Sequence, residues 1–596
     1  MDTITVNGPE DVLDWAAIDW RHHEANVARL RRRIFKATWE GDWASVRSLQ
    51  KMMLRSWSNT LLCVRQVTQR NAGRRTAGID GQIAMSAVAR TEVAVQVHRT
   101  RSSWSPLPVR RVHIPKSNGK LRPLGIPVIM DRCHQARVRN ALEPEWEARF
   151  EPNSYGFRPG RGCADARQAL FHTLSKTRSQ RVWILDADLT AAFDRIDHAK
   201  LVDAIGSFPA RDLIQNWLKA GVIEQGQFTP TEEGSPQGGV ISPLLMNVAL
   251  HGMEEAAGVR YHASGTKVGA TREGSPVLVR YADDLAVCCN TREQAEQVKA
   301  RLAAWLAPRG LVFNEDKTRI VHLTDGFDFL GFNVRRYLRN GKLLIKPSPD
   351  AVRRIRRRLA EEVRGLRGSN AMAVIARLGP IIRGWAAYYR GVVASRVFSS
   401  LDTYVWRLLY KWAVRTHPKK PKKWIAKRYF GRFNKFRNDR WVFGDRARTS
   451  ERGGVPYLAK FSWTPIVRHQ KVTGRASPDD PALTEYWRQR RKKITPPLDS
   501  YNLRLLDSQE GRCPLCGDHL LTADQPPQRP REWERWWLST ARRAIAAEYL
   551  AYAGRGDGRD GNRTRLVHAS CHRSLRARQR RRPAPSSQPA TPSRLA

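Results

Sequence analysis

The chain has 596 residues, 41% of them hydrophobic, which is too long for one hydrophobic core and predicts several folded domains. Its formal net charge of +48 argues against neutral partners alone and predicts a polyanion, with nucleic acid as the first candidate and an anionic membrane surface as the second. There is no long apolar run or secretory signal, and only eight cysteines are present. We therefore expect a cytoplasmic chain without a membrane partner.

Hydrophobic periodicity predicts the coarse order of elements. Apolar residues recur at helical spacing from about residue 15 to residue 70, and the glycines of 71–81 end this pattern. From there to about residue 347, short β-like runs alternate with helical ones, which is typical of an α+β fold. Residues 350–413 again have helical periodicity.

Two apolar runs of the α+β part end in aspartates. The run 182–185 leads into Asp186 and Asp188, which strand alternation places on one face. In "VRYADDLAVCC", Asp283 and Asp284 separate two Val- and Leu-rich runs, which predicts a hairpin with the carboxylates at its tip.

Adjacent carboxylates repel one another unless cations are present. Three of them on neighbouring strands, Asp188, Asp283 and Asp284, can hold two Mg²⁺ ions for in-line phosphoryl transfer. For "ADD" alone, a solvated turn is the alternative, because Asp is common in turns.

Residues 411–440 combine Lys and Arg with aromatic side chains, and Asp439 is their only acidic residue. This composition suits RNA, because cations meet phosphates while rings stack on unpaired bases. The rings are Trp412, Trp424, Tyr429, Phe430, Phe433 and Phe436. Lys419, Lys420, Lys422 and Lys423 are the candidate RNA-binding residues; a solvated basic face is the alternative. A loop-rich basic region is predicted to follow to about residue 497.

The C-terminal part contains paired Cys/His motifs. "CPLCG" supplies Cys513 and Cys516, and "HASCH" supplies His568 and Cys571 at the matching spacing. Three thiolates and one imidazole predict a single structural Zn²⁺ site; thiols without metal are the alternative. The Pro/Ser-rich tail 581–596 is predicted to be disordered.

Seven sequence blocks in order resemble the reverse transcriptases encoded by group II introns. The blocks are Arg110–Arg132, Asn153–Gly162, "DADLTAAFDRID", "EGSPQGGVISPLLMNVAL", "YADD", Leu311–Ile320 and Phe327–Val334. "IIRGWAAYYRGV" (Ile381–Val392) is similar to the maturase domain of that family, which doubles as the thumb, and residues 19–50 are similar to its N-terminal extension.

The resemblance implies roles for individual residues. Asp188, Asp283 and Asp284 match the catalytic, magnesium-binding carboxylates. Phe193 matches the aromatic gate that selects dNTPs, and Gln237 matches a residue of the nucleotide pocket. Lys116 and Arg122 match residues that clamp the triphosphate, and Lys317 matches a lysine proposed to protonate pyrophosphate. The alternative for Phe193 is an ordinary position in the hydrophobic core. The alternative for Lys116, Arg122 and Lys317 is a solvated position on the surface.

The C-terminal motifs resemble an HNH endonuclease domain, in which Asn562 and His572 match. However, Trp536 and Trp537 stand where that motif has two adjacent histidines, and Arg576 replaces a final histidine. Since an indole cannot act as a base or a metal ligand, we expect the domain to be inactive as a nuclease.

We therefore predict a multidomain α+β protein: a right-hand polymerase with fingers and palm, a helical thumb/maturase domain and a small zinc-binding HNH-like module. The predicted domains are an N-terminal extension (1–80), fingers and palm (81–347), thumb/maturase (348–440), a DNA-binding region (441–500), the HNH-like module (501–580) and the tail (581–596). The expected partners are group II intron RNA, target DNA and dNTPs. A splicing maturase with a vestigial polymerase and a domesticated reverse transcriptase in host defence are the alternatives.

Overall fold

The computed structural model describes residues 14–571, except 16, 116–120, 177–178, 267, 340, 435–436, 449–453, 494–497, 499, 516–519, 521–526, 539–543, 550–562 and 569–570. Three predicted features therefore lie outside the described residues in whole or in part: Lys116, the tail 581–596, and the Cys516, Asn562, His572 and Arg576 positions of the C-terminal motifs. None of the described helices combines the length and apolarity that crossing a membrane requires.

The N-terminal part is helical, as predicted. Helices α1 (Trp20–Trp39), α2 (Trp43–Arg55) and α3 (Trp57–Arg65) begin after Asp19, Asp42 and Ser56, whose side chains accept hydrogen bonds from backbone N–H groups of the first turn. They pack on α5 (Ile129–Arg149). A π-turn (Gln66–Arg70), a 3₁₀ turn (Ala72–Arg75) and α4 (Ala87–Arg99) lead into the α+β part.

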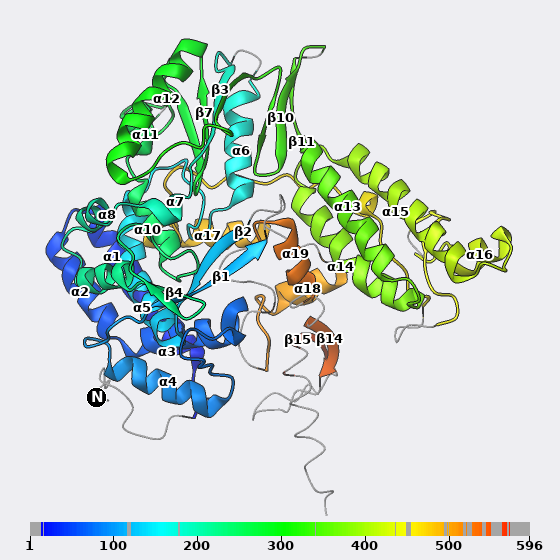
Figure 1. The fold of residues 1–596 in the computed structure, drawn as a ribbon, viewed down its shortest axis with the longest axis horizontal. Helices are drawn as coiled ribbons and strands as arrows, with labels where there is room; N and C mark the ends of the chain where they lie inside the picture. The colour runs from blue at the N-terminus through cyan, green and yellow to red at the C-terminus, as the bar shows by residue number, and fades with distance from the viewer. Residues whose placement is uncertain are drawn as a thin grey trace, which may run out of the picture.

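Two four-stranded sheets form the α+β part (Figure 1). The first, called here the hairpin sheet, has the order β2-β1-β4-β5, with β1 (Val109–Pro115), β2 (Leu121–Ile126), β4 (Val222–Glu224) and β5 (Gln227–Thr229). The second, called the central sheet, has the order β6-β7-β3-β8, with β3 (Trp183–Asp188), β6 (Val277–Tyr281), β7 (Asp284–Cys289) and β8 (Arg319–His322).

The central sheet separates two hydrophobic cores. Leu185, Leu278 and Val287 point into one core with α12 (Arg292–Leu306), whereas Ile184, Val279 and Ala286 point into the other with α6 (Cys163–Leu174). This alternation follows from the two-residue period of a strand buried on both faces. The predicted strands around both aspartate motifs are therefore confirmed.

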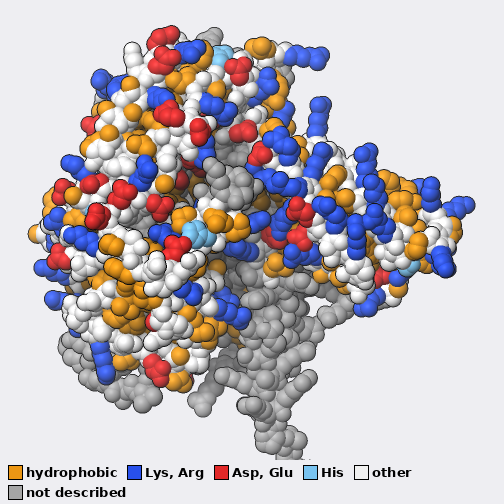
Figure 2. All heavy atoms as spheres, viewed as in Figure 1, with side chains coloured by type: hydrophobic (Ala, Val, Ile, Leu, Met, Phe, Trp, Pro, Cys, Tyr) orange, Lys and Arg blue, Asp and Glu red, His pale blue; other side chains and the backbone are white. Residues whose placement is uncertain are grey.

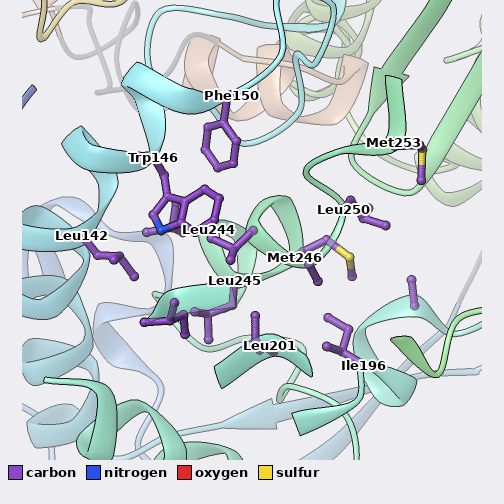
Figure 3. Close-up of a cluster of buried hydrophobic side chains, with 14 of the residues drawn as sticks. Leu142, Trp146, Phe150, Ile196, Leu201, Leu244, Leu245, Met246, Leu250 and Met253 are labelled. Atoms are coloured by element: carbon purple, nitrogen blue, oxygen red, sulfur yellow. The ribbon is translucent and has the colours of Figure 1, made fainter. Parts of the chain in front are cut away.

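Short helices complete the first core. They are α7 (Ala192–Arg195), α8 (His198–Ile205), α9 (Arg211–Lys219), α10 (Ser242–Ala249) and α11 (Met253–Ala256), with a 3₁₀ turn at Ala307–Arg309. In Figure 3, Trp146 of α5 lies beside Leu244 of α10, and Phe150, which follows the end of α5, lies above Trp146 in the same core. Val27, Leu30 and Ile34 of α1 belong to the same core, which therefore joins the N-terminal helices to the central sheet.

A three-stranded sheet leads into four helices. Strands β9 (Phe327–Phe329), β10 (Phe332–Tyr337) and β11 (Lys342–Pro347) pair antiparallel. The helices, called here the helical arm, are α13 (Pro349–Gly365), α14 (Ala371–Tyr389), α15 (Ser395–Thr416) and α16 (Lys422–Tyr429). The helical prediction for 350–413 is confirmed.

The chain then returns to the central sheet. Strands β12 (Phe430–Gly431) and β13 (Val442–Phe443) are followed by 3₁₀ turns at Phe461–Trp463 and Pro481–Leu483 and by α17 (Thr484–Lys493). Asp165 of α6 accepts hydrogen bonds from Val472 N at 2.8 Å and Arg490 at 3.0 Å. The region predicted to be loop-rich thus includes one helix and is anchored by a buried carboxylate.

The C-terminal elements are α18 (Ser500–Ser508), α19 (Pro530–Trp536), β14 (Ala544–Tyr549) and β15 (Arg563–His568). β14 and β15 form an antiparallel pair, and α18 packs on β15. Figure 1 shows α19 in the middle of the molecule, between β2 and α14.

Candidate active site

The "YADD" segment forms the predicted hairpin. Tyr281, the last residue of β6, pairs with Asp284, the first residue of β7, so that Ala282 and Asp283 make the turn. Ala282 has φ +58°, a left-handed conformation that costs an alanine about 1–2 kcal/mol. Asp284 pairs on its other side with Asp188 of β3. The fold thus brings the three predicted carboxylates together, with backbone strain at the turn.

The carboxylates repel one another. Burial raises the pKa of Asp284, and the charges of Asp283 and Asp188 raise it further. Burial and the charge of Asp188 also raise the pKa of Asp283, while Arg122 partly offsets the increase. Such a cluster favours the approach of cations.

One cation of the chain already touches the cluster. The ammonium group of Lys317 donates a hydrogen bond to Asp188, and this bond raises the pKa of Lys317. The Lys317 side chain is 62% exposed, so it can leave the carboxylate at little cost. Its contact shows that a positive charge fits beside Asp188.

The three aspartates suit magnesium, although their side chains do not enclose a metal position. Within the described ranges, no three His, Cys, Asp or Glu side chains surround a common metal position. The three aspartates nevertheless offer only carboxylate oxygens, the ligands that Mg²⁺ prefers. Burial and mutual repulsion raise the pKa values of Asp283 and Asp284, so a bound cation would stabilise their ionised forms. These residues therefore fit divalent cations.

Asp186 has a different environment from Asp188. It lies opposite Ala286 and Arg319, and its carboxylate accepts a hydrogen bond from Arg319 at 3.4 Å. Burial raises its pKa to about 6. Each aspartate of "DAD" thus meets an exposed cation of the chain, but only Asp188 lies opposite an aspartate of the hairpin, Asp284.

The structure describes the surroundings of two predicted nucleotide residues, Phe193 and Gln237. Phe193 is 8% exposed and packs edge-on against Phe157, with the two ring centres 6.2 Å apart. The Gln237 carbonyl accepts a hydrogen bond from Gly125 N of β2 at 2.9 Å. Gly238 has φ +134°, and a Cβ there would lie 2.5 Å from the Gly125 carbonyl oxygen. The glycine lets the Gln237 loop run against the strand that carries Arg122.

A buried support behind the hairpin escaped the sequence prediction. Arg280 of β6 is fully buried; its guanidinium donates to Asn247 Oδ1 at 3.0 Å and to the Ala282 carbonyl at 3.5 Å. Asn247 in turn donates to the Gly156 carbonyl at 2.8 Å. A Cβ on Gly156 would collide with Ala282 N. The strained residue before Asp283 is thus held from two sides.

Two carboxylates complete this support. Glu151 lies 3.9 Å from the Arg280 guanidinium and accepts backbone hydrogen bonds from Gly252 and Glu254, each at 2.9 Å. Burial raises the pKa of Glu254 to about 8, and the charge of Glu151 adds to this effect. An arginine inside the apolar run "VLVRY" was the signal that could have revealed this network.

The predicted zinc residues are only partly described. Cys513 is buried and Cys571 half-buried, and both belong to one small core with Leu520, Leu566 and Trp536. The backbone of His568 ends β15, whereas its side chain lies outside the described part. The fold thus brings one cysteine of each motif into the same core. Trp536 fills this core, which accounts for an indole at that position.

The candidate RNA-binding lysines are exposed, but half of the aromatic side chains are not. Lys419, Lys420, Lys422 and Lys423 all face solvent around the start of α16. Trp412, Tyr429 and Phe430 are 3–5% exposed in the core of the helical arm. The expectation that these three rings stack on bases is therefore wrong, since their apolar area is used for packing. Trp424 and Phe433 are half-buried, and Phe436 lies outside the described residues.

Figure 2 shows Lys and Arg side chains crowded over the helical arm. A hollow of about 500 Å³ between α13 and α15 is lined by Arg364, Arg367, Lys411 and Arg415 among others. Such a surface attracts phosphate groups.

Comparisons with known proteins agree with this geometry. Residues 114–334 match the family model for reverse transcriptase (RNA-dependent DNA polymerase). Residues 15–97 match the N-terminal domain of reverse transcriptase, and residues 352–430 match the group II intron, maturase-specific domain. The matched ranges include the hairpin, the N-terminal helices and the helical arm.

Among curated relatives, the protein YkfC of Escherichia coli is 34% identical over 54% of this chain and 91% of its own length. The group II intron-encoded protein LtrA of Lactococcus lactis is 30% identical over 39% of this chain and 48% of its own length. The maturase-like protein 1 of Euglena gracilis is 26% identical over 62% of this chain and 76% of its own. The chain therefore belongs to the reverse transcriptases that carry a group II intron maturase-specific domain.

Proposed function

We propose that this chain copies a group II intron RNA into DNA at the Asp188–Asp283–Asp284 cluster, and that its basic helical arm binds the same RNA and assists its splicing. In this proposal the hairpin sheet is the fingers, the central sheet the palm and the helical arm the thumb. The observation that carries it is the convergence of three mutually repelling carboxylates at a strained, firmly supported hairpin.

The chain's own residues divide the work. Asp188 and Asp283, with Asp284, would hold two Mg²⁺ ions, which activate the primer 3′-hydroxyl and neutralise the triphosphate. Arg122 and Lys116 bind the triphosphate through charge-assisted hydrogen bonds. Phe193 lies under the sugar and excludes a 2′-hydroxyl, and the Gln237 loop lines the nucleotide pocket. Lys317 donates a proton to the leaving pyrophosphate.

The proposal is tested by primer extension. Phe193→Ala removes the ring that excludes the 2′-hydroxyl, so incorporation of NTPs relative to dNTPs should rise about tenfold or more, with little change in dNTP use. Equal discrimination by wild type and variant would contradict the role of Phe193. Phe157→Leu, which alters the packing partner and not the ring itself, is the matched control.

The role of the helical arm is tested by measuring RNA binding at several salt concentrations. We expect intron RNA to bind more tightly than unrelated RNA, with a log–log salt slope of about −0.7 for each single-stranded phosphate contact. Reversing Lys419, Lys420, Lys422 and Lys423 to Glu together should weaken binding and flatten the slope. An unchanged slope would show that these lysines form a solvated face only.

We also propose that the C-terminal module binds one Zn²⁺ through Cys513, Cys516, His568 and Cys571, contacts target DNA together with the region before it, and does not cut the second DNA strand. The shared core of Cys513 and Cys571 supports the zinc site, and the packing of Trp536 supports the lack of cleavage. Loss of one zinc equivalent in Cys516→Ser is expected. Protein-dependent cutting of a labelled duplex, abolished by His572→Ala, would contradict the second part.

Such a protein would act where intron RNA, chromosomal DNA and dNTPs occur together, in the bacterial cytoplasm and nucleoid.

A further inference from the structure

The segment Gln528–Trp537, called here the docked segment, crosses from the central sheet to the helical arm. At its first end, the Cys163 backbone N–H donates to Gln528 Oε1 at 2.6 Å, and the Gln528 N–H donates to Glu532 Oε2 at 2.7 Å. A Cβ on Gly162 would collide with the Gln528 side chain. The start of α6 thus receives the segment at close range.

Its second end is fixed on the helical arm. Glu534 forms a bidentate ion pair with Arg358 of α13, at 2.7 and 2.8 Å. A Cβ on Gly384 of α14 would lie 2.6 Å from Glu534 N and 2.8 Å from Glu534 Cα. The Arg383 guanidinium lies 5.3 Å from the Trp537 ring centre. Gly384 lies inside a helix, where glycine costs about 1 kcal/mol relative to alanine, and the approach of α19 explains its presence.

Between these ends the segment passes beside the hairpin. Trp533 of the segment packs against the hydrophobic core that also contacts Tyr281, the last residue of β6. Arg529 of the segment also acts electrostatically on Asp283. The segment therefore lies beside the tyrosine that precedes the carboxylate cluster.

A helix with its side chains is about 10 Å across. In the proposed function the helical arm is the thumb, so a primer end at Asp283 would bring its duplex between the central sheet and the arm, where α19 lies beside α14 (Figure 1). We propose that the docked segment and an RNA–DNA duplex occupy this sheet–arm face in turn, so that the chain is closed without nucleic acid and the duplex displaces the segment. This inference rests on the proposed polymerase function.

The charges favour such an exchange. The Glu534–Arg358 pair uses a cation of the arm, and phosphate groups compete for that cation when a duplex arrives. Arg529, Arg531 and Arg535 are exposed on the segment, so a released segment can still bind the nucleic acid that replaced it.

Hydrogen–deuterium exchange of the full chain tests the inference. A saturating primed RNA template should accelerate exchange at 528–537 by about tenfold or more, while α15 stays protected. In the Gly384→Ala and Glu534→Arg variants, the amides of 528–537 should exchange rapidly even without nucleic acid. Both variants should also bind the primed template about tenfold more tightly, because the form that can bind is no longer a minority.

Asp507→Arg is the matched control, because it makes the same charge change at an exposed position of α18; it should behave as wild type. Combining Glu534→Arg with Arg358→Glu should restore slow exchange. Binding of the primed template with unchanged or slower exchange at 528–537 would overturn the inference while leaving the polymerase function intact. Absence of binding in every protein, wild type included, would overturn both.

Discussion

Two clusters of carboxylates lie on either side of the same hairpin and are stabilised in opposite ways. The rear pair, Glu151 and Glu254, is held by Arg280, by backbone N–H groups and by the Tyr261 hydroxyl. The front cluster, Asp188, Asp283 and Asp284, has no comparable buried cation among the described residues, and the cation that donates to Asp188 is the exposed Lys317. The rear pair meets a buried cation and fixed hydrogen-bond donors and is structural, whereas the front cluster lacks such a buried cation and is available to metal ions.

The largest difference is expected in catalysis. Asp188→Ala and Asp283→Ala should each slow single-nucleotide extension at least about a thousandfold, because each loses a metal ligand needed in the transition state. Glu254→Gln should remain within about tenfold of wild type. Affinity for the primed template, measured in parallel, should change little in all three. Extension by either aspartate variant within tenfold of wild type would disprove the assignment.

The second prediction concerns Arg280, the buried cation of the rear pair. Arg280→Ala leaves Glu151 buried without its counter-charge, and breaking a buried pair from one side costs about 3–5 kcal/mol. Chemical denaturation should show this loss, and extension should slow because Ala282 loses its support. The double variant with Glu151→Gln should recover part of the stability. No recovery would mean that Arg280 acts through packing rather than charge.

The third prediction concerns pH. The folded-state pKa of Glu254 is raised to about 8, by burial first and by Glu151 second, so the folded chain holds this proton more tightly than the unfolded chain. Its stabilising contribution is complete below the unfolded pKa and is lost as pH rises through about 8, with a slope of at most about 1.4 kcal/mol per pH unit. Glu254→Gln should flatten this slope in denaturation measured between pH 5 and 9. An identical slope in wild type and variant would show that Glu254 is not the source of the pH dependence of stability.

The smallest effect is expected from Asp284→Asn. Removing one charge from the front cluster should stabilise the chain in EDTA by about 1 kcal/mol at neutral pH, because burial and repulsion disfavour the ionised form there. Excess Mg²⁺ should abolish or reverse the difference in melting temperature. A destabilised variant in EDTA would show that the ionised Asp284 has a structural partner.

The sequence predicted the front cluster better than the rear one, for a physical reason. Asp188 ends an apolar strand, and Asp283 and Asp284 lie between two others, so local patterning alone places them at the ends of strands. Glu151 and Glu254 meet Arg280 only through tertiary packing across segments with no shared pattern. The same limit applies to Trp412, Tyr429 and Phe430. The composition of 411–440 favoured stacking of these rings on RNA bases, and only the packing of the helical arm shows that they are core residues. The docking of α19 on α14 was likewise beyond local patterning, although Gly384 inside a helix was a clue.

The most direct test of the central claim is a thermal melt in Mg²⁺ against one in EDTA. Millimolar Mg²⁺ should raise the melting temperature of wild type by several degrees, since a ligand that binds only the folded chain stabilises it. Mg²⁺ should leave the melting temperatures of the Asp188→Asn and Asp283→Asn variants almost unchanged. It should raise the melting temperature of the Glu254→Gln variant as much as that of wild type. A magnesium response that survives both aspartate substitutions, or that disappears in Glu254→Gln, would contradict the assignment of the front cluster as the cation site.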